Sequence, residues 1–317
     1  MIPGNKKIGL VLPQWEGAMG GETARGADII SLAQLSEEVG FVSVWTVDQI
    51  LFDLGEYYSL QDMEITEDLE GRKLGFWECW TVTSALAAAT SRVEIGTLVT
   101  CTAYRNPALL ARMADTVDEL SGGRLILGVG AGALESEFAA FGFDWDRRVG
   151  HFEEALKIIC PLLKGESVTF DGEFYRTKEA QLVPKGVRPG GPPILIGTVA
   201  GGPRMRRLVV QYAHQWNCWL AEDSRPDAYS EPYDLMLRAC EKFERDPATL
   251  TKNVAVGVCL EGFPPTPGEL PLTGSIAEIA EKVGRFLDAD IDHLVVQLTP
   301  CTREGVERLS QILSQLR

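Results

Sequence analysis

Short apolar runs alternate along the chain with longer segments in which apolar residues recur every three or four positions. Most of the short runs are apolar throughout, which is typical of parallel strands covered on both faces. The pattern therefore predicts strands at residues 8–12, 41–47, 93–100, 125–129, 193–197, 215–219, 254–260 and 293–298.

The longer segments have the spacing of amphipathic helices. Asn106 suits an N-cap and Pro107 the first helical position, while Gly40 is a suitable C-terminal stop. The predicted helices span residues 27–40, 106–120, 148–164, 275–287 and 303–316.

Strands that alternate with helices in this way predict an α/β fold, a single (β/α)8 TIM barrel over residues 1–317, with an open doubly wound sheet as the alternative. Insertions follow strands 2, 4 and 7, at residues 53–74, 165–191 and 262–273. Within the second insertion, residues 168–175 predict a hairpin that turns at Asp171-Gly172. Chemistry in a barrel lies at the carboxyl ends of the strands, so candidate residues are sought there.

Composition narrows the range of partners. The 317 residues include 30 Lys and Arg against 45 Asp and Glu, a net charge of −15, which argues against general nucleic-acid or membrane-surface binding. No apolar run is long enough for a membrane span or a signal peptide, so we expect a cytoplasmic protein. The seven cysteines form no CxxC pair and the three histidines no HxH or HExxH motif, so we expect no metal site.

The ends of strands 4 and 5 carry small residues. Gly130 and Gly132 could let a flat ring approach the backbone, although a tight turn would also explain them. After Gly197 and Thr198, the sequence Gly201-Gly202-Pro203 suits the start of a helix whose free N–H groups would face an anion. An ordinary glycine loop followed by solvated arginines is the alternative. The arginines are Arg204, Arg206 and Arg207.

Polar and aromatic residues follow strand 2. Asp48 could bond a ring N–H, hold the loop of Trp45 or cap the following turn. Trp45, Trp77 and Trp80 could wall a pocket, but tryptophans at such spacing are more often core residues. Glu78, at the start of a helix, suits compensation of the helix dipole.

The strand ends, taken in order, resemble one known family. The segment Tyr104-Arg105-Asn106-Pro107, the turn Ser121-Gly122-Gly123-Arg124 and the run from Gly128 to Gly132 together resemble the luciferase-like monooxygenase superfamily, closest to its coenzyme F420-dependent oxidoreductases. The resemblance covers residues 8–250. It implies a deazaflavin, coenzyme F420, across the barrel mouth, with FMN as the alternative, and a homodimer.

The resemblance also implies site residues. A non-proline cis peptide is expected at Leu98–Val99, behind the ring, and Arg148 is a second candidate for binding phosphate. The full set implied or inferred for cofactor binding is Asp48, Leu98, Val99, Thr100, Gly130, Ala131, Gly132, Arg148, Gly197, Thr198, Gly201 and Gly202.

The sequence departs from the family at two positions. Members often carry His directly after the acidic residue that ends strand 2, but here Gln49 follows Asp48, and an amide cannot titrate near neutral pH. We keep both as candidate catalytic residues by position. Ala133 stands where some deazaflavin sugar-phosphate dehydrogenases have Glu, which disfavours that activity. The candidate substitutes for the missing acid are Glu135, Glu137 and His214.

The leading hypothesis is hydride transfer between F420 and a small organic substrate, a step that depends more on placement than on an ionisable side chain. The first alternative is a two-component monooxygenase that uses reduced FMN; a reductase partner would supply reduced flavin or F420. A non-catalytic flavin-binding protein is the second. A barrel hydrolase that pairs Glu135 or Glu137 with Glu261 is the third. The acidity of residues 53–70 would select a neutral or cationic substrate, or simply keep a lid solvated.

Overall fold

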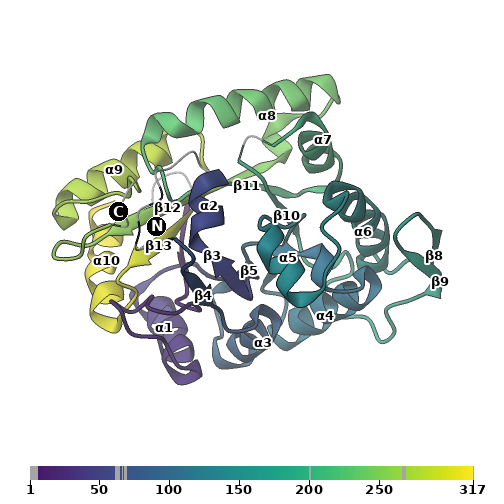
Figure 1. Ribbon diagram of the computed structural model, residues 1–317, viewed down its shortest axis with the longest axis horizontal. Helices are drawn as coiled ribbons and strands as arrows, with labels where there is room; N and C mark the ends of the chain where they lie inside the picture. Colours follow the sequence, from purple (N-terminus) through teal and green to yellow (C-terminus); the bar gives the residue numbers. More distant parts are fainter. Residues whose placement is uncertain are drawn as a thin grey trace.

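The computed structural model describes residues 6–60, 65, 67, 70–199, 201–265 and 269–316. In this part of the chain, eight parallel strands pair in a ring, which closes because β13 pairs with β1 and β7 with β10 (Figure 1). This confirms the predicted barrel and excludes the open sheet. In ring order the strands are β1 (Lys7–Val11), β2 (Ser43–Thr46), β5 (Glu94–Thr97), β7 (Leu125–Gly130), β10 (Ile194–Gly197), β11 (Gln215–Leu220), β12 (Thr251–Cys259) and β13 (His293–Thr299).

The third predicted strand is broken in two. β5 ends at Thr97, and the pairing with β7 resumes in β6 (Thr100–Cys101). The peptide bond between Leu98 and Val99, in the break, is cis, as the family resemblance implied.

Helices surround the barrel. Asn106 caps α4 by accepting hydrogen bonds from Ala108 N and Leu109 N, and Gly40 ends α1 in the left-handed conformation, with φ 101°, both as predicted. No helix in the described ranges is both long and apolar enough to cross a membrane. The helices are α1 (Gly26–Val39), α3 (Cys79–Ala89), α4 (Pro107–Leu120), α5 (Glu135–Phe141), α6 (Arg148–Leu163), α7 (Pro203–Tyr212), α8 (Ser230–Lys242), α9 (Ile276–Asp288) and α10 (Arg303–Gln315), with short 3-10 turns at Thr102–Tyr104, Pro226–Tyr229 and Pro247–Thr249.

One tryptophan fills the barrel interior. Trp45 is fully buried, and a Cβ added at Gly96 on the neighbouring strand would lie 2.1 Å from its ring. A Cβ at Gly9, on the other side, would lie 2.7 Å from its Nε1. The two glycines therefore make room for Trp45, which is core and does not line a pocket.

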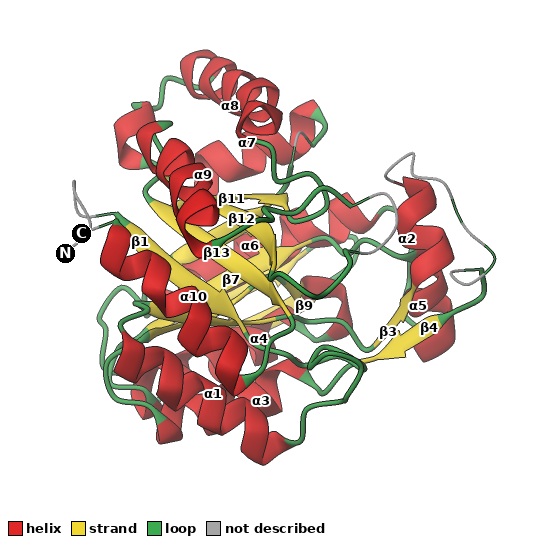
Figure 2. Ribbon diagram, turned by 90° about the vertical axis from the view of Figure 1, so that its left-hand side faces the viewer, coloured by secondary structure: helices red, strands yellow, loops and turns green. Residues whose placement is uncertain are grey.

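The first insertion forms β3 (Leu51–Asp53), α2 (Leu54–Leu60) and β4 (Lys73–Gly75). These elements project beyond one end of the barrel, together with α5 (Figure 2). They follow the carboxyl end of β2, so the end that they cover is the mouth.

The second insertion contains the predicted hairpin, β8 (Val168–Asp171) and β9 (Arg176–Ala180). Its turn is longer than predicted, because Asp171 pairs with Arg176. The Glu154 carboxylate explains the longer turn, since it accepts hydrogen bonds from the backbone N–H groups of residues 173, 174 and 175. Part of the third insertion, residues 266–268, lies outside the described residues.

Candidate active site

A cavity of about 760 Å³ opens at the carboxyl ends of the strands. Strand ends that are far apart in the sequence meet there, and they bring together most of the predicted site residues. The predicted residues that line it are Asp48, Gln49, Leu98, Val99, Gly130, Ala131, Gly132, Gly197 and Thr198.

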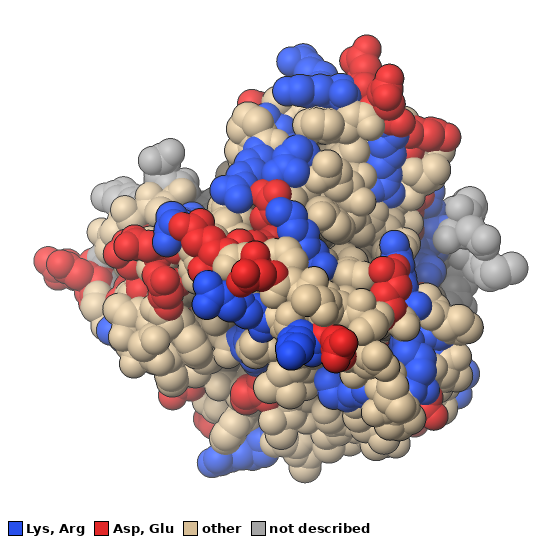
Figure 3. Space-filling view, turned by 90° about the vertical axis from the view of Figure 1, so that its right-hand side faces the viewer, with Lys and Arg blue, Asp and Glu red and all other residues tan. Residues whose placement is uncertain are grey.

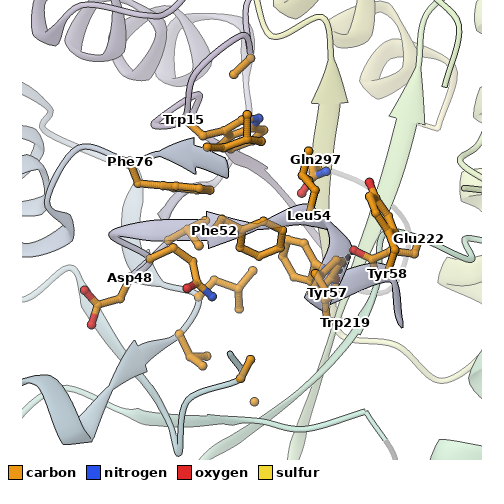
Figure 4. Close-up of a pocket in the computed structure, with 18 of the residues that line it drawn as sticks. Trp15, Asp48, Phe52, Leu54, Tyr57, Tyr58, Phe76, Trp219, Glu222 and Gln297 are labelled. Atoms are coloured by element: carbon orange, nitrogen blue, oxygen red, sulfur yellow. Dashed lines mark hydrogen bonds between the residues drawn. The ribbon is translucent and has the colours of Figure 1, made fainter. Parts of the chain in front are cut away.

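The walls of the cavity are aromatic, and the sequence analysis missed them. Trp45 and Trp80 are buried in the core, while Trp77 is 44% exposed, and none of the three lines the cavity. The aromatic density of residues 52–58 was the only local signal, because the other rings come from distant segments. Figure 4 shows several of these walls. The lining aromatic residues are Trp15, Phe52, Tyr57, Tyr58, Phe76, Tyr104, Trp219 and Phe263.

Two glycines of the cavity floor leave space for the Val99 side chain. A Cβ at Gly130 would lie 2.7 Å from Val99 Cγ2, and one at Gly197 would lie 2.9 Å from Val99 Cγ1. Gly132 has φ +87°, and a Cβ there would lie 2.5 Å from the Phe138 ring. These glycines therefore admit neighbouring side chains and a tight turn, while the approach of a flat ring to their backbone stays a prediction.

Thr100 does not line the cavity. The residue is fully buried and is not among the residues that line the cavity. Leu98, Val99 and Cys101 supply the cavity surface of this segment, so cofactor binding by Thr100 stays a prediction without support from the cavity geometry.

Asp48 is held by protein groups. It is 3% exposed, and its two oxygens accept hydrogen bonds from the Arg105 guanidinium at 2.6 and 2.9 Å. The backbone N–H of Cys101 donates a third, at 2.9 Å. Arg105 also pairs with Glu78, 2.6 Å away, whose carboxylate caps α3. Asp48 therefore fixes Arg105 and β6, and it neither holds the Trp45 loop nor caps the following turn.

Gln49 lies between the cavity and a buried carboxylate. With its amide nitrogen turned toward Glu137, Nε2 lies 3.1 Å from Oε1 and 2.5 Å from Oε2. Glu137 is 1% exposed and also accepts hydrogen bonds from Ile50 N and the Tyr104 hydroxyl. Burial raises its pKa, but Glu137 lies behind Gln49 and does not line the cavity, so it is wrong as the substitute acid.

The other acid candidates also fail on position. His214 precedes β11 at the amino end of the barrel, where Nδ1 accepts a hydrogen bond from Ile194 N at 3.0 Å. Burial, together with Arg245 and Lys164, lowers its pKa. Glu135 and Glu261 are not among the residues that line the cavity, which removes the geometric basis for a hydrolase pair.

A carboxyl group that the sequence analysis did not consider lies in the cavity wall. Glu222 follows β11, and its Oε1 accepts hydrogen bonds from the Tyr57 hydroxyl and, at 3.0 Å, from Trp219 Nε1. Burial raises its pKa, against the effect of these two donors. Tyr58 donates a comparable bond to Glu269 at 2.7 Å.

The predicted helix start after strand 5 is present. Gly202 is the N-cap of α7 and Pro203 occupies its first turn. Gly201 has φ +53°, and neither Gly201 nor Gly202 lines the main cavity, although Gly197, Thr198 and Val199 do. Thr198 and Val199 therefore lie at the cavity, whereas Gly202 lies at the amino end of α7.

A second cavity, of about 250 Å³, lies at the amino end of α6 and is lined by Arg147, Arg148 and Arg204. Arg147 pairs with Glu173, and Arg204 with Glu153 at 2.8 Å. The Arg148 guanidinium lies 4.1 Å from the centre of the Trp145 ring. On the face that carries α6, α7 and the hairpin, basic side chains are interspersed with acidic ones (Figure 3).

Comparison with known proteins agrees with this geometry. Over residues 7–261, the chain matches the luciferase-like monooxygenase family. It is 31% identical over 256 residues to an F420-dependent hydroxymycolic acid dehydrogenase of Mycobacterium tuberculosis, covering 79% of this chain and 62% of that protein. It is 30% identical over 203 residues to a 5,10-methylenetetrahydromethanopterin reductase of Archaeoglobus fulgidus, covering 59% of each.

Among solved structures, the chain is similar to an F420-dependent secondary alcohol dehydrogenase in complex with an F420–acetone adduct. The TM-score is 0.77 at 19% identity, over 98% of this chain and 99% of that one. This likeness supports the fold, and the family match covers most of the sequence. The chain therefore belongs to the luciferase-like monooxygenase family.

Proposed function

We propose that this chain is an oxidoreductase that transfers a hydride between coenzyme F420 and a small organic substrate. The observation that carries the proposal is the floor of the cavity, where Val99 lies between Gly130 and Gly197 at the carboxyl ends of the strands. Its support from similarity is that two relatives at about 30% identity are an F420-dependent dehydrogenase and a reductase. The bound cofactor would supply or accept the hydride.

The residues present fit a flat ring system. Val99 presents an apolar surface against which one face of the ring would rest, while the aromatic walls leave the other face to the substrate. The insertion of β3, α2 and β4 covers the mouth and would exclude water. Holding two reactants in contact in a covered site is the main requirement of hydride transfer.

The residues also fit an anionic tail. Gly197 and Thr198 line the cavity, and Gly202 is the N-cap of α7, whose first-turn N–H groups favour anions. Arg148 and Arg204 lie in the second cavity, at the amino end of α6. We propose that the phosphate-bearing tail of the cofactor follows this path, with Thr198 as a hydroxyl donor.

Titration of the purified protein with F420 and with FMN, followed by fluorescence quenching, tests the proposal. We expect saturable F420 binding at micromolar concentrations. An R148Q/R204Q double variant should weaken it about tenfold or more, because two positive charges leave the path of the tail. R176Q is the matched control, since Arg176 is exposed on β9 and lines neither cavity.

Three outcomes would contradict the proposal. Failure of F420 to bind at tens of micromolar would remove its basis. Preferential FMN binding, with oxygen consumption when a flavin reductase is added, would favour the monooxygenase alternative. Tight binding of F420 without turnover on any substrate would favour a non-catalytic flavin-binding protein.

A further inference from the structure

Glu222 is a carboxyl group in the cavity wall with unused hydrogen-bonding capacity. Both of its side-chain bonds, from Tyr57 and Trp219, reach Oε1. Among the described residues, no other side chain donates to this carboxyl group, although the backbone N–H of Glu222 itself also interacts with it. Neighbouring side chains therefore fix Oε1, while Oε2 receives no bond from another side chain and can meet a molecule in the cavity.

The position of Glu222 is set by contacts across the barrel. Tyr57 belongs to the insertion after β2, whereas Glu222 follows β11, and these two strands lie opposite one another in the ring. Trp219, like Val99, packs against the hydrophobic cluster that fills the barrel interior around Trp45. The carboxyl group is thus held over the mouth by a residue of the barrel interior and a residue of the covering insertion, as Figure 4 shows.

The surroundings favour the neutral form of Glu222. No Lys, Arg or His in the described ranges forms an ion pair with it. Two nearby charged groups have other partners: Asp223 pairs with Arg225 at 2.6 Å, and Glu269 accepts a hydrogen bond from Tyr58. Arg72 lines the same cavity but forms no ion pair with Glu222 among the described residues. Leu270 N donates a hydrogen bond to the backbone carbonyl of Glu222, at 2.7 Å, and not to its carboxyl group. Burial without a cation raises the pKa of a carboxyl group.

We infer that protonated Glu222 is the catalytic acid of this site and exchanges its Oε2 proton with the oxygen of a carbonyl or alcohol substrate. This inference rests on the proposed function. Glu222, at the carboxyl end of β11, would thus supply the proton that Gln49, at the carboxyl end of β2, cannot supply.

The step balances in both directions. In reduction, the reduced deazaflavin would, when bound, supply the hydride to the substrate carbonyl carbon, while the Oε2–H bond of Glu222 breaks and its proton forms the O–H bond of the alcohol product. The electron pair of the broken bond stays on Glu222 as a carboxylate, which Tyr57 and Trp219 stabilise at Oε1. Solvent returns a proton when the product leaves, and oxidation is the reverse.

The E222Q variant tests the inference, because a Gln side chain keeps an acceptor for Tyr57 and Trp219 but cannot give up a proton. Infrared difference spectra of wild type against E222Q, recorded over a pH titration, isolate the carboxyl stretch of Glu222. We expect its midpoint above the ordinary Glu range of about 4.3. A midpoint at or below that value overturns the inference, whether or not a substrate has been found.

Turnover gives the second readout, with F420 and a panel of ketones and secondary alcohols. We expect E222Q to lower kcat about 100-fold or more while the Kd for F420 changes less than threefold. The matched variant Y57F removes the hydrogen bond from the covering insertion but keeps the Glu222 carboxyl group. It should therefore lower kcat much less than E222Q does, and shift the pH profile of kcat. If E222Q keeps wild-type kcat, the inference is wrong while the proposed function stands; absence of F420 binding by the wild type would instead refute the proposed function.

Discussion

The two ends of the barrel each use a tryptophan whose indole N–H meets a polar partner, but with opposite consequences. Toward the amino end, Trp45 Nε1 donates to Ser43 Oγ at 2.8 Å, and the same oxygen lies 2.8 Å from His293 Nε2. At the mouth, Trp219 Nε1 donates to Glu222, beside the cavity.

The difference lies in what fills the remaining space. Gly9 and Gly96 let the backbone close around Trp45, so every neighbour is protein. Around Trp219, the neighbours on one side are the cavity and the insertion that covers it. A tryptophan packed on all sides by protein contributes stability, whereas one that borders a cavity leaves space in which a ligand can bind.

The largest expected effect comes from creating a cavity around Trp45, toward the amino end of the barrel. Replacing Trp45 with Ala should lower the free energy of unfolding by about 3–5 kcal/mol, because a large cavity would remain in a rigid barrel. The control W219A should lose at least about 2 kcal/mol less, since Trp219 already borders a cavity. Denaturant unfolding measures both, and equal losses would contradict the comparison.

The next effect concerns the buried ion pair of the mouth. R105Q should cost about 3 kcal/mol, because it leaves the Asp48 carboxylate, 1% exposed, without its cation. Arg176 and Asp171 form an exposed pair, with side chains 80% and 82% exposed, so R176Q should change stability by less than about 0.5 kcal/mol. Similar losses in the two variants would show that Asp48 does not depend on Arg105.

Acid should lower the stability of the protein through His293, at the amino end of the barrel. Burial, with a contribution from Lys7, lowers the pKa of His293 from 6.5 to about 3. The unfolded chain therefore binds the proton first, so the contribution of neutral His293 is intact above about pH 6.5 and is lost as pH falls toward 3. The loss approaches about 1.4 kcal/mol per pH unit, or about 2 kcal/mol by pH 5. H293Q should flatten the slope of stability between pH 6.5 and 5, and an unchanged slope would contradict this.

The smallest effect is expected at Glu222. Because burial raises its pKa in the folded state, the folded form retains the proton longer, and stability is lost as pH rises through that pKa. E222Q should therefore be more stable than wild type at pH 8, by about 1 kcal/mol or less, with no difference near pH 4. Higher stability of the wild type at pH 8 would indicate a charged Glu222 that is well stabilised.

The amino-acid sequence by itself determined the barrel. Apolar runs separated by amphipathic segments placed all eight strands, because parallel strands buried on both faces and helices buried on one face leave different patterns. Local chemistry also fixed the ends of elements, such as Asn106 at α4 and Pro203 at α7. These features depend on residues adjacent in the chain.

Only the tertiary structure decided which side chains face the cavity. A strand that is apolar throughout does not reveal which residues point inward, so Trp45 and Thr100 were open to assignment to the pocket until packing buried them. The contact between Tyr57 and Glu222 joins residues 165 positions apart. Such a pair leaves no local signal, because its proximity follows from ring closure and from the path of an insertion across the mouth.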